Sequence, residues 1–379
     1  MKIRLPAVEG KTETYHLAGE PIAVRRPKVP FNRVAFAAAH VVADPLSSMG
    51  ALDWDRTLAF RHYLLDQGFG IAEAMDTSQR GMGLGWPLAH ELISRSLKSA
   101  GPAATRIYSG CGTDHLPAGT AHNLDDVVKA YLEQLYAVQK LGGRVILMAS
   151  RALVRVAKSP DDYVKIYSRV LAEAQHPVIL HWLGEMFDPA LAGYWGSADF
   201  PAAMKTCLAA INANAAKVDG IKISLLDAEK EIVFRRQLTA GVKMYTGDDF
   251  NYPELIAGDA EGFSHALLGI FAAIAPAAAA ALTALAKGNT KKFHKLMDPT
   301  VPLSRLIFRA PTQYYKTGIV FLAWLNGHQE HFIMVNGAQS ARPLLYFTEA
   351  FKLADQAGLL RDPDLAVKRM KSLLTLYGQ

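Results

Sequence analysis

Eight short apolar segments, separated by stretches with helical character, constrain the fold of this chain more than any other feature. Most of these segments are apolar on both faces, which is typical of parallel strands that helices cover on both sides of a sheet. The intervening stretches carry apolar residues at helical spacing, most clearly at residues 124–141, and Asn123 and Ser159 are favourable N-cap residues. Eight strand–helix units predict a (β/α)8 barrel. The predicted strands are residues 33–40, 69–75, 105–110, 144–149, 177–182, 218–224, 241–246 and 262–266.

Two further regions flank the predicted barrel, which we place at residues 31–290. Residues 1–30 contain an alternating pattern and several prolines, which predict a small β-hairpin or clamp. Residues 291–379 form a helical region that either covers the flank of the barrel or builds an oligomer interface. An open, doubly wound sheet is the alternative fold, but no glycine-rich dinucleotide turn follows the first strand. The predicted C-terminal helices include residues 314–325, 343–356 and 363–377.

Composition narrows the classes of protein that this chain can represent. Half of its 379 residues are apolar, which is enough to bury a large core. The formal net charge of +6 is scattered along the sequence, so we expect no nucleic-acid partner. Cys111 and Cys207 are too few for a disulfide framework and lack the spacing of metal ligands, which fits a cytoplasmic protein. No apolar segment follows Lys2 and Arg4, so we expect no secretory signal.

An uncharged segment at residues 266–286 is long enough to span a membrane by length alone. It is mostly alanine, which gains little free energy on transfer into lipid, and it runs directly into Lys287. Pro276 is expected to divide its helical part into two pieces. We therefore predict a buried strand end followed by a packed helix, and no membrane partner.

Lys222 interrupts the apolar segment at residues 218–224. Burial disfavours the charged form of an amine, lowers its pKa and makes it a nucleophile for carbonyl carbon. The next strand ends in two acids, Asp248 and Asp249. A buried lysine at one strand end and carboxylates at the next suggest Schiff-base chemistry. The structural alternative is a lysine that extends to the strand mouth and pairs with an aspartate.

Other candidate residues follow from the same topology, because barrel active sites are built from the carboxyl ends of strands. His181 suits proton transfer, since the ordinary pKa of histidine lies near neutrality. Glu73 lies within an apolar strand, so we expect it to point into the barrel or to pair with a cation. Together the strand ends supply Glu73, Asp76, Asp114, Ser150, Arg151, His181 and Asp248.

Two of these candidates have alternative explanations outside a site. Asp114 follows a flexible glycine-containing segment and is also suited to capping the next helix. Arg151 is suited to binding an anionic group of a substrate, or to a surface pair with Asp161 or Asp162.

Several motifs occur in an order that resembles the N-acetylneuraminate lyase and dihydrodipicolinate synthase superfamily of class I aldolases and lyases. Gly220-Ile221-Lys222 lies on the sixth strand, Gly247-Asp248-Asp249 follows the seventh, and Glu261-Gly262-Phe263-Ser264 begins the eighth. The resemblance extends over roughly residues 30–360 and indicates a divergent, dihydrodipicolinate synthase-like branch. It implies a (β/α)8 barrel, a Schiff base on Lys222, a substrate-binding role for Ser264 and a homo-oligomer, either a dimer or a tetramer.

The chain departs from this family at three places, one of which follows the fourth strand, where Ser150-Arg151-Ala152-Leu153 replaces an expected tyrosine pair. The family's second strand normally ends in a loop whose hydroxyls and amides hold a keto-acid carboxylate. The aligned loop here supplies hydroxyls from Thr77 and Ser78, whereas Asp76 would repel a carboxylate at close range. The family's fifth strand carries a tyrosine that shuttles protons, and the aligned residue here is His181.

From these observations we expect a class I aldolase or lyase that needs no cofactor and acts on a hydroxylated keto-sugar or keto acid. In this hypothesis Lys222 forms the imine, His181 moves the proton, and Asp248 orients Lys222 or a substrate hydroxyl. One alternative is a metal-dependent sugar isomerase or lyase. Its ligands would come from the imidazoles and carboxylates at the barrel mouth, which are His40, Glu73, Asp114, His115, His181, Glu185 and Asp248. Another is a ligand-binding protein in which Lys222 has only a structural role.

Overall fold

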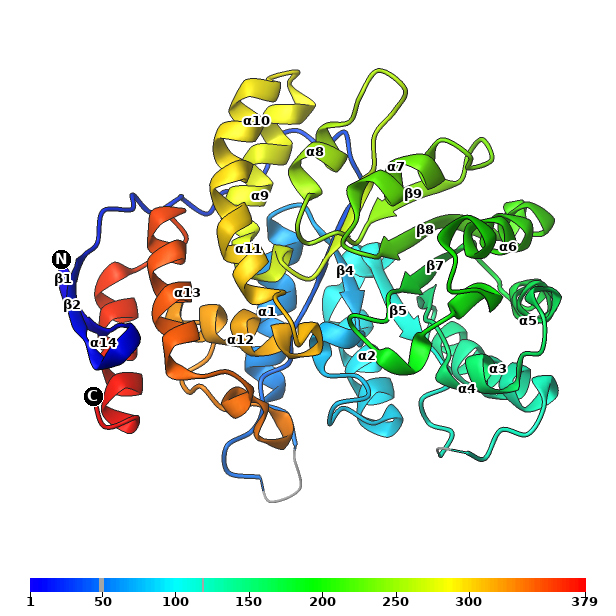
Figure 1. The fold of residues 1–379 in the computed structure, drawn as a ribbon, viewed down its shortest axis with the longest axis horizontal. Helices are drawn as coiled ribbons and strands as arrows, with labels where there is room; N and C mark the ends of the chain where they lie inside the picture. The colour runs from blue at the N-terminus through cyan, green and yellow to red at the C-terminus, as the bar shows by residue number, and fades with distance from the viewer. Residues whose placement is uncertain (48–50, 118) are drawn as a thin grey trace. The chain divides into compact units, whose positions relative to one another are not determined.

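A computed structural model describes residues 1–47, 51–117 and 119–379 of the chain (Figure 1). Eight parallel strands close into a barrel in the order β10-β3-β4-β5-β6-β7-β8-β9. The predicted (β/α)8 barrel is therefore confirmed, and the open doubly wound sheet is wrong because the first and last strands meet. The strands are β3 Ala35–Ala38, β4 Gly70–Glu73, β5 Ile107–Cys111, β6 Arg144–Leu147, β7 Val178–Leu183, β8 Val218–Ser224, β9 Lys243–Thr246 and β10 His265–Leu268.

Each barrel strand is followed by at least one helix, as the alternating pattern predicts. The Asn123 side chain accepts a hydrogen bond from the Asp126 amide at 3.0 Å, and the Asp162 carboxylate accepts one from the Ser159 amide at 3.1 Å. Both predicted N-caps are thus confirmed, because these bonds satisfy amides that a helix start leaves unpaired. The helices of the strand–helix units are α1 Trp54–Asp66, α2 Trp86–Ala100, α3 Leu124–Lys140, α4 Arg151–Val156, α5 Pro160–Ala172, α6 Phe200–Ala213, α7 Ala228–Arg235, α8 Tyr252–Ala257 and α9 Phe271–Ala286.

The alanine-rich segment forms the end of β10 and the buried helix α9, as predicted. The predicted division into two helical pieces is present as a kink, since the backbone of α9 leaves helical geometry at Ile274, two residues before Pro276. A kink at that place is expected, because proline lacks an amide donor and its ring crowds the preceding turn. Across the described residues, no helix is both long and apolar enough to cross a membrane.

The described residues group into two compact units. One contains Met1–Phe69, Thr77–Gln79 and Gly269–Gln379, and the other contains Gly70–Asp76 and Arg80–Leu268. The predicted hairpin exists in the first unit as antiparallel strands β1 Lys2–Pro6 and β2 Thr12–His16. The C-terminal helices belong to this unit too, and α10 lies beside α9 (Figure 1). They are α10 Thr290–Met297, α11 Val301–Ile307, α12 Tyr315–Leu325, α13 Leu344–Gln356 and α14 Pro363–Leu376.

The N-terminal hairpin is held against helix α13 by one buried carboxylate. Asp355 accepts hydrogen bonds from the Tyr15 hydroxyl at 2.8 Å and from the Ala18 amide at 3.0 Å. Lys352 of the same helix forms an ion pair with Glu13 at 2.7 Å. The first thirty residues therefore pack with the C-terminal helices in the first unit, whereas the division into three domains made from the sequence remains a prediction.

Candidate active site

A cavity of about 420 Å³ opens in the second unit, beside the carboxyl ends of β4 to β7. Its volume lies in the range of small-molecule sites. Four of the predicted site residues line it: Asp76, Asp114, Arg151 and His181. Leucine and methionine side chains contribute the apolar part of the wall. The structure therefore brings together groups from four different strand ends, as a barrel active site requires.

Lys222 lies on β8, directly paired with His181 of β7 in the strand register. Paired residues of neighbouring parallel strands point to the same face of the sheet, so Lys222 faces the barrel interior as His181 does. Its side chain is buried, with 7% of the residue exposed. Within the described residues, its amine has no side-chain hydrogen bond or ion pair. Burial lowers the pKa of Lys222, while the charges of Asp76 and Asp249 oppose that shift.

His181 is buried and its Nε2 atom lies 3.2 Å from the Ser224 hydroxyl. Burial holds the pKa of His181 well below its ordinary value, and the nearby charge of Lys222 lowers it further. The imidazole is therefore neutral at physiological pH. A neutral ring can accept a proton, and Ser224 fixes the orientation of that ring.

Gly247 leaves space for the lysine side chain, and Gly220 leaves space for the ring of Tyr245. A Cβ atom at Gly247 would lie 2.8 Å from Cε of Lys222, and one at Gly220 would lie 2.6 Å from the ring of Tyr245. Both distances are shorter than real Cβ contacts, so a side chain at either position would force its neighbour to move. Gly247 thus permits the loop after β9 to pass beside the amine. This is the physical reason for the glycine in the Gly-Asp-Asp motif.

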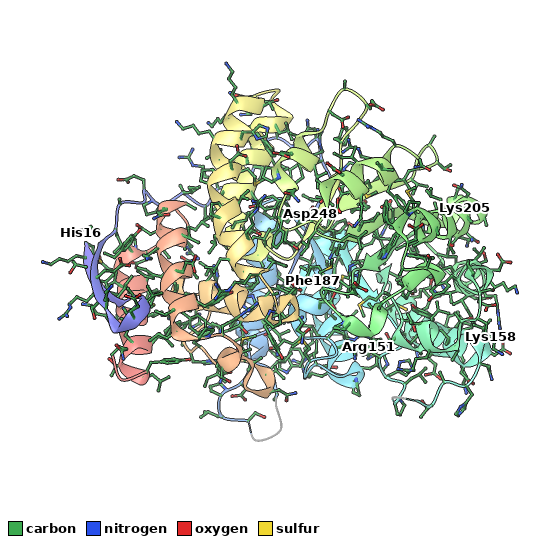
Figure 2. All side chains as sticks on the ribbon, viewed as in Figure 1. His16, Arg151, Lys158, Phe187, Lys205 and Asp248 are labelled. Atoms are coloured by element: carbon green, nitrogen blue, oxygen red, sulfur yellow. The ribbon has the colours of Figure 1, made fainter. Side chains whose placement is uncertain are left out.

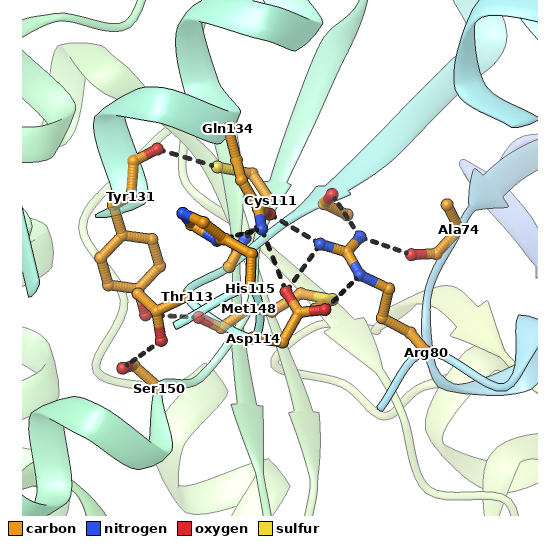
Figure 3. A network of polar contacts seen from close by, with 12 residues as sticks. Ala74, Arg80, Cys111, Thr113, Asp114, His115, Tyr131, Gln134, Met148 and Ser150 are labelled. Atoms are coloured by element: carbon orange, nitrogen blue, oxygen red, sulfur yellow. Dashed lines mark hydrogen bonds and ion pairs between the residues drawn. The ribbon is translucent and has the colours of Figure 1, made fainter. Parts of the chain in front are cut away.

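The loop after β4 is fixed by a buried arginine that sequence reasoning missed. Arg80 contacts both carboxylate oxygens of Asp114 at 2.7 Å, and its Nη2 atom also donates to Gln134 at 2.6 Å (Figure 3). Its Nη1 atom donates to the carbonyls of Ala74 and Gly110 at 3.1 Å each. Burial alone would raise the pKa of Asp114, but the hydrogen bonds and charge of Arg80 outweigh it, so the pKa lies below its ordinary value. Asp114 therefore joins two strand-end loops.

A second hydroxyl network fixes the start of α4. The hydroxyls of Thr113 and Ser150 lie 2.7 Å apart, and the Ser150 amide donates to the Tyr194 hydroxyl at 3.1 Å. Ser150 also caps α4 by accepting a hydrogen bond from the Leu153 amide at 3.0 Å. Thr113 lines the cavity, so the substrate-binding role predicted for Ser150 would act through this pair.

The two acids after β9 have different roles. Asp248, the residue that the sequence argument favours, accepts hydrogen bonds from the amides of Phe250 and Asn251 and from the Asn251 side chain, at 2.8 to 3.0 Å. Its carboxylate therefore shapes the turn after β9 (Figure 2). Burial nevertheless raises its pKa. Its neighbour Asp249 is the acid whose charge acts on Lys222.

Two predicted substrate-binding residues contact the helical layer instead of the cavity. One carboxylate oxygen of Glu73 accepts a hydrogen bond from Ser96 of α2 at 2.6 Å, and the other accepts one from the Ala74 amide at 2.8 Å. The Glu73 side chain thus points from the strand toward helix α2, and not into the barrel as expected. The Ser264 hydroxyl donates to Glu231 of α7 at 2.7 Å. Burial raises the pKa of Glu231 to about 8.

Thr77 and Ser78, both in the first unit, use their hydroxyls in contacts with the protein. The Thr77 hydroxyl lies 2.8 Å from that of Tyr315, and the Ser78 hydroxyl donates to the Ala39 carbonyl at 2.7 Å. Both residues are buried. Their predicted role in substrate binding stays a prediction, and it requires these hydroxyls to exchange partners.

Arg151 pairs with a different acid from those considered in the sequence. Its Nε atom lies 2.6 Å from the Asp188 carboxylate, and its side chain is 55% exposed at the start of α4 (Figure 2). Asp161 and Asp162 lie in the first turn of α5, where Asp162 caps the helix. The long loop between β7 and α6 supplies Asp188, and the sequence gives no signal for how that loop folds back.

The alternative of a metal site depends on donors that come together. Among the residues that the structure describes, no three histidine, cysteine, aspartate or glutamate side chains form a group suited to a metal ion. His115, one of the proposed ligands, instead contacts Gln134 at 2.8 Å and Glu133 at 2.9 Å.

Some of the missed residues had a signal in the sequence. Gln134 is a polar residue on the otherwise apolar stripe of α3, and a polar group at a core position usually has a buried partner. Arg80 follows a strand end, where every charged residue deserves consideration in a barrel. Asp188 and Arg155 had no such signal.

Comparisons with known proteins give the family and the fold. A family model described as "Protein of unknown function (DUF993)" matches residues 3–379. The chain belongs to this family. No curated protein matches the chain.

Solved structures resemble this member of the DUF993 family over most of its length. YagE, a prophage protein of the dihydrodipicolinic acid synthase family from E. coli K12, solved in complex with pyruvate, has a TM-score of 0.67 and 14% identity. Dihydrodipicolinate synthase from Aquifex aeolicus has a TM-score of 0.64 and 12% identity. Each match covers 86% of this chain and 99% of the other. The resemblance predicted from the sequence is thereby confirmed at the level of the fold.

Proposed function

We propose that this protein is a class I aldolase or lyase that forms a Schiff base through Lys222. The observation that carries the proposal is a buried amine with no ion pair within the described residues, on a strand next to a neutral histidine that lines a cavity. Burial lowers the pKa of that amine, so a larger fraction of it is unprotonated and nucleophilic. The membership of the solved neighbours in the dihydrodipicolinate synthase family supports the same chemistry.

The chemical steps follow from the two side chains. The Lys222 amine attacks the substrate carbonyl carbon, the C–N bond forms, and the carbonyl oxygen takes up protons and leaves as water. In the cleavage direction, neutral His181 takes the proton of the hydroxyl on the carbon at the far end of the C–C bond that breaks. The electron pair of the broken C–C bond moves into the iminium and gives an enamine, while an aldehyde leaves. Protonation of the enamine carbon and hydrolysis of the imine then restore Lys222.

The walls of the cavity support a hydroxylated keto-sugar or keto acid as the substrate. Thr113, Asp114 and Arg151 supply polar atoms around the space beside His181. Hydroxyl groups of the substrate can form additional hydrogen bonds with these residues at several points, whereas bare pyruvate offers no hydroxyl group to them. The pyruvate found in the YagE complex is a 2-keto acid, which is consistent with this substrate class. We also propose that the protein acts as a homo-oligomer, as the family resemblance implies, and in the cytoplasm, which fits its two cysteines.

The test is borohydride trapping of the imine with a panel of keto acids, keto-sugars and keto-sugar acids. We expect an adduct that peptide mapping assigns to Lys222, with an added mass that identifies the substrate. Lys222→Ala should abolish the adduct, and Lys205→Ala, at an exposed lysine of α6, is the matched control (Figure 2). An adduct on another lysine, or normal turnover by Lys222→Ala, would contradict the proposal. Activity without any adduct but lost on chelation would favour the metal-dependent alternative.

A further inference from the structure

Most of the charged residues that line the cavity are paired. Arg80 is paired with Asp114, and Arg151 is paired with Asp188. Two others line the cavity, Asp76 and Arg155, and neither has a side-chain hydrogen bond or ion pair among the described residues. The charge of Asp76 acts on Lys222, whereas Arg155 lies on α4, so the α4 wall of the cavity keeps the positive charge of Arg155.

The geometry of α4 places Arg155 and Arg151 together. They are four residues apart in one helix, and side chains at this spacing lie on the same helix face. Both line the cavity, which also includes His181. Asp188 neutralises Arg151 through its Oδ2 atom, while its Oδ1 atom accepts a hydrogen bond from the Ala190 amide at 3.1 Å. Arg151 is therefore held by a residue that the following loop fixes, and Arg155 is available to a ligand.

We propose that Arg155, with Arg151 beside it, forms a subsite for an oxyanion carried by the substrate away from its reacting carbonyl. This inference rests on the proposed function. It narrows the proposed substrate class to a keto-sugar or keto-sugar acid that ends in a phosphate or a carboxylate. Both groups share the chemistry that guanidinium binds best, two oxygens matched to parallel N–H donors. One cavity of about 420 Å³ touches both His181 and Arg155, so a single occupant can contact both.

The subsite makes a distinctive prediction about Asp188. Asp188→Asn removes the charge that neutralises Arg151 and keeps a side-chain oxygen that can still accept from the Ala190 amide. If an oxyanion binds here, this variant should bind it more tightly, because the local charge rises by one. Removal of Arg155 should have the opposite effect.

The experiment measures binding to the Lys222→Met protein by calorimetry, so that no imine forms. The probes are three six-carbon 2-keto-3-deoxy acids that differ only at the last carbon, which carries a hydroxyl, a phosphate or a carboxylate. We expect one or both charged compounds to bind at least about tenfold more tightly than the hydroxyl compound, as charge-assisted hydrogen bonds allow. Arg155→Gln should reduce that ratio to about one, and Asp188→Asn should increase it. Lys158→Gln is the control, at an exposed cation just beyond α4 that does not line the cavity (Figure 2).

The outcomes separate this inference from the proposed function. Equal affinity for the three compounds, no binding at millimolar concentration, or a ratio that survives Arg155→Gln would overturn the subsite. Preference for the phosphate or for the carboxylate identifies which oxyanion the substrate carries, and either preference supports the subsite. If the ratio depends on Arg155 while borohydride traps no adduct on Lys222 in the unsubstituted protein, the subsite stands and the Schiff-base function falls.

Discussion

Lys222 and Arg80 are two buried cations of the same compact unit, and their surroundings are opposite. Arg80 is fully enclosed by acceptors, with a carboxylate, an amide oxygen and two carbonyls around its guanidinium. Within the described residues, Lys222 has no such partner, and only the more distant charges of Asp76 and Asp249 favour its protonation. A buried charge with partners stabilises a structure, whereas a buried amine without partners tends to lose its proton. The difference indicates a structural role for Arg80 and supports the chemical role that we propose for Lys222.

The largest expected effect tests the chemical role that we propose for Lys222. Lys222→Met should reduce turnover of the substrate identified by trapping by at least about 10³-fold, as loss of a covalent nucleophile does. Steady-state kinetics measures the loss, and Lys205→Met serves as the control at an exposed position. Retention of even a tenth of the activity would mean that Lys222 does not form the imine.

The structural role of Arg80 predicts a large loss of stability when this residue is replaced. Arg80→Met leaves the Asp114 charge and two carbonyls without their donor, which should cost about 3–5 kcal/mol in the free energy of unfolding. Lys222→Met breaks no ion pair and should change that free energy by less than about 1 kcal/mol. Urea unfolding followed by circular dichroism gives both values.

A second variant keeps this prediction testable if Arg80→Met fails to fold. Arg80→Met combined with Asp114→Asn removes both charges of the pair, so it should recover part of the loss. Comparable costs for Arg80→Met and Lys222→Met would remove the contrast between the two cations.

A smaller loss of stability is expected from changes at Gln134, which is a hydrogen-bond partner of Arg80. Its amide oxygen accepts from Arg80 and from the Gly112 amide at 2.7 Å, and its amide nitrogen contacts Asp114 at 3.1 Å. Gln134→Leu should cost about 1–3 kcal/mol, because buried donors would lose their acceptor. Gln134→Met keeps the length of the side chain but also lacks the acceptor, so it should cost nearly as much. A much smaller loss for Gln134→Met than for Gln134→Leu would show that side-chain packing, and not the hydrogen bonds, holds this network.

The smallest expected effect is a dependence of the free energy of unfolding on pH, caused by His181, which is paired with Lys222 in the strand register. Burial lowers the pKa of His181 below the ordinary value of 6.5, so below pH 6.5 the unfolded state binds the proton more readily than the folded state. The free energy of unfolding should therefore rise as pH increases toward 6.5 and stay constant above it, as far as His181 contributes. Denaturant unfolding between pH 5 and pH 8 should show a shallower rise in His181→Asn. An unchanged slope in that variant would mean that His181 does not titrate with folding.

The fold was predictable from sequence because its signal is local. Apolar segments such as residues 144–149 and 218–224 contain strands β6 and β8 almost residue for residue. Pro276 is a further local signal, because a proline predicts a break in a helix, and the backbone of α9 is kinked at Ile274, two residues before it. Packing of the buried helix on both sides of the kink offsets the cost of the missing hydrogen bond.

The sequence by itself determined the strand that carries Lys222 and the strand that carries His181, since these follow from period and strand order. The space that Gly247 leaves for the amine is visible only in the tertiary structure. Only the tertiary structure decided which acids act on which cations. Asp249 rather than Asp248 influences Lys222, Arg80 holds Asp114, and Asp188 neutralises Arg151. Those choices depend on how loops between strands fold back over the barrel mouth. Loop conformation is set by long-range packing and hydrogen bonds, which no local pattern in the sequence records.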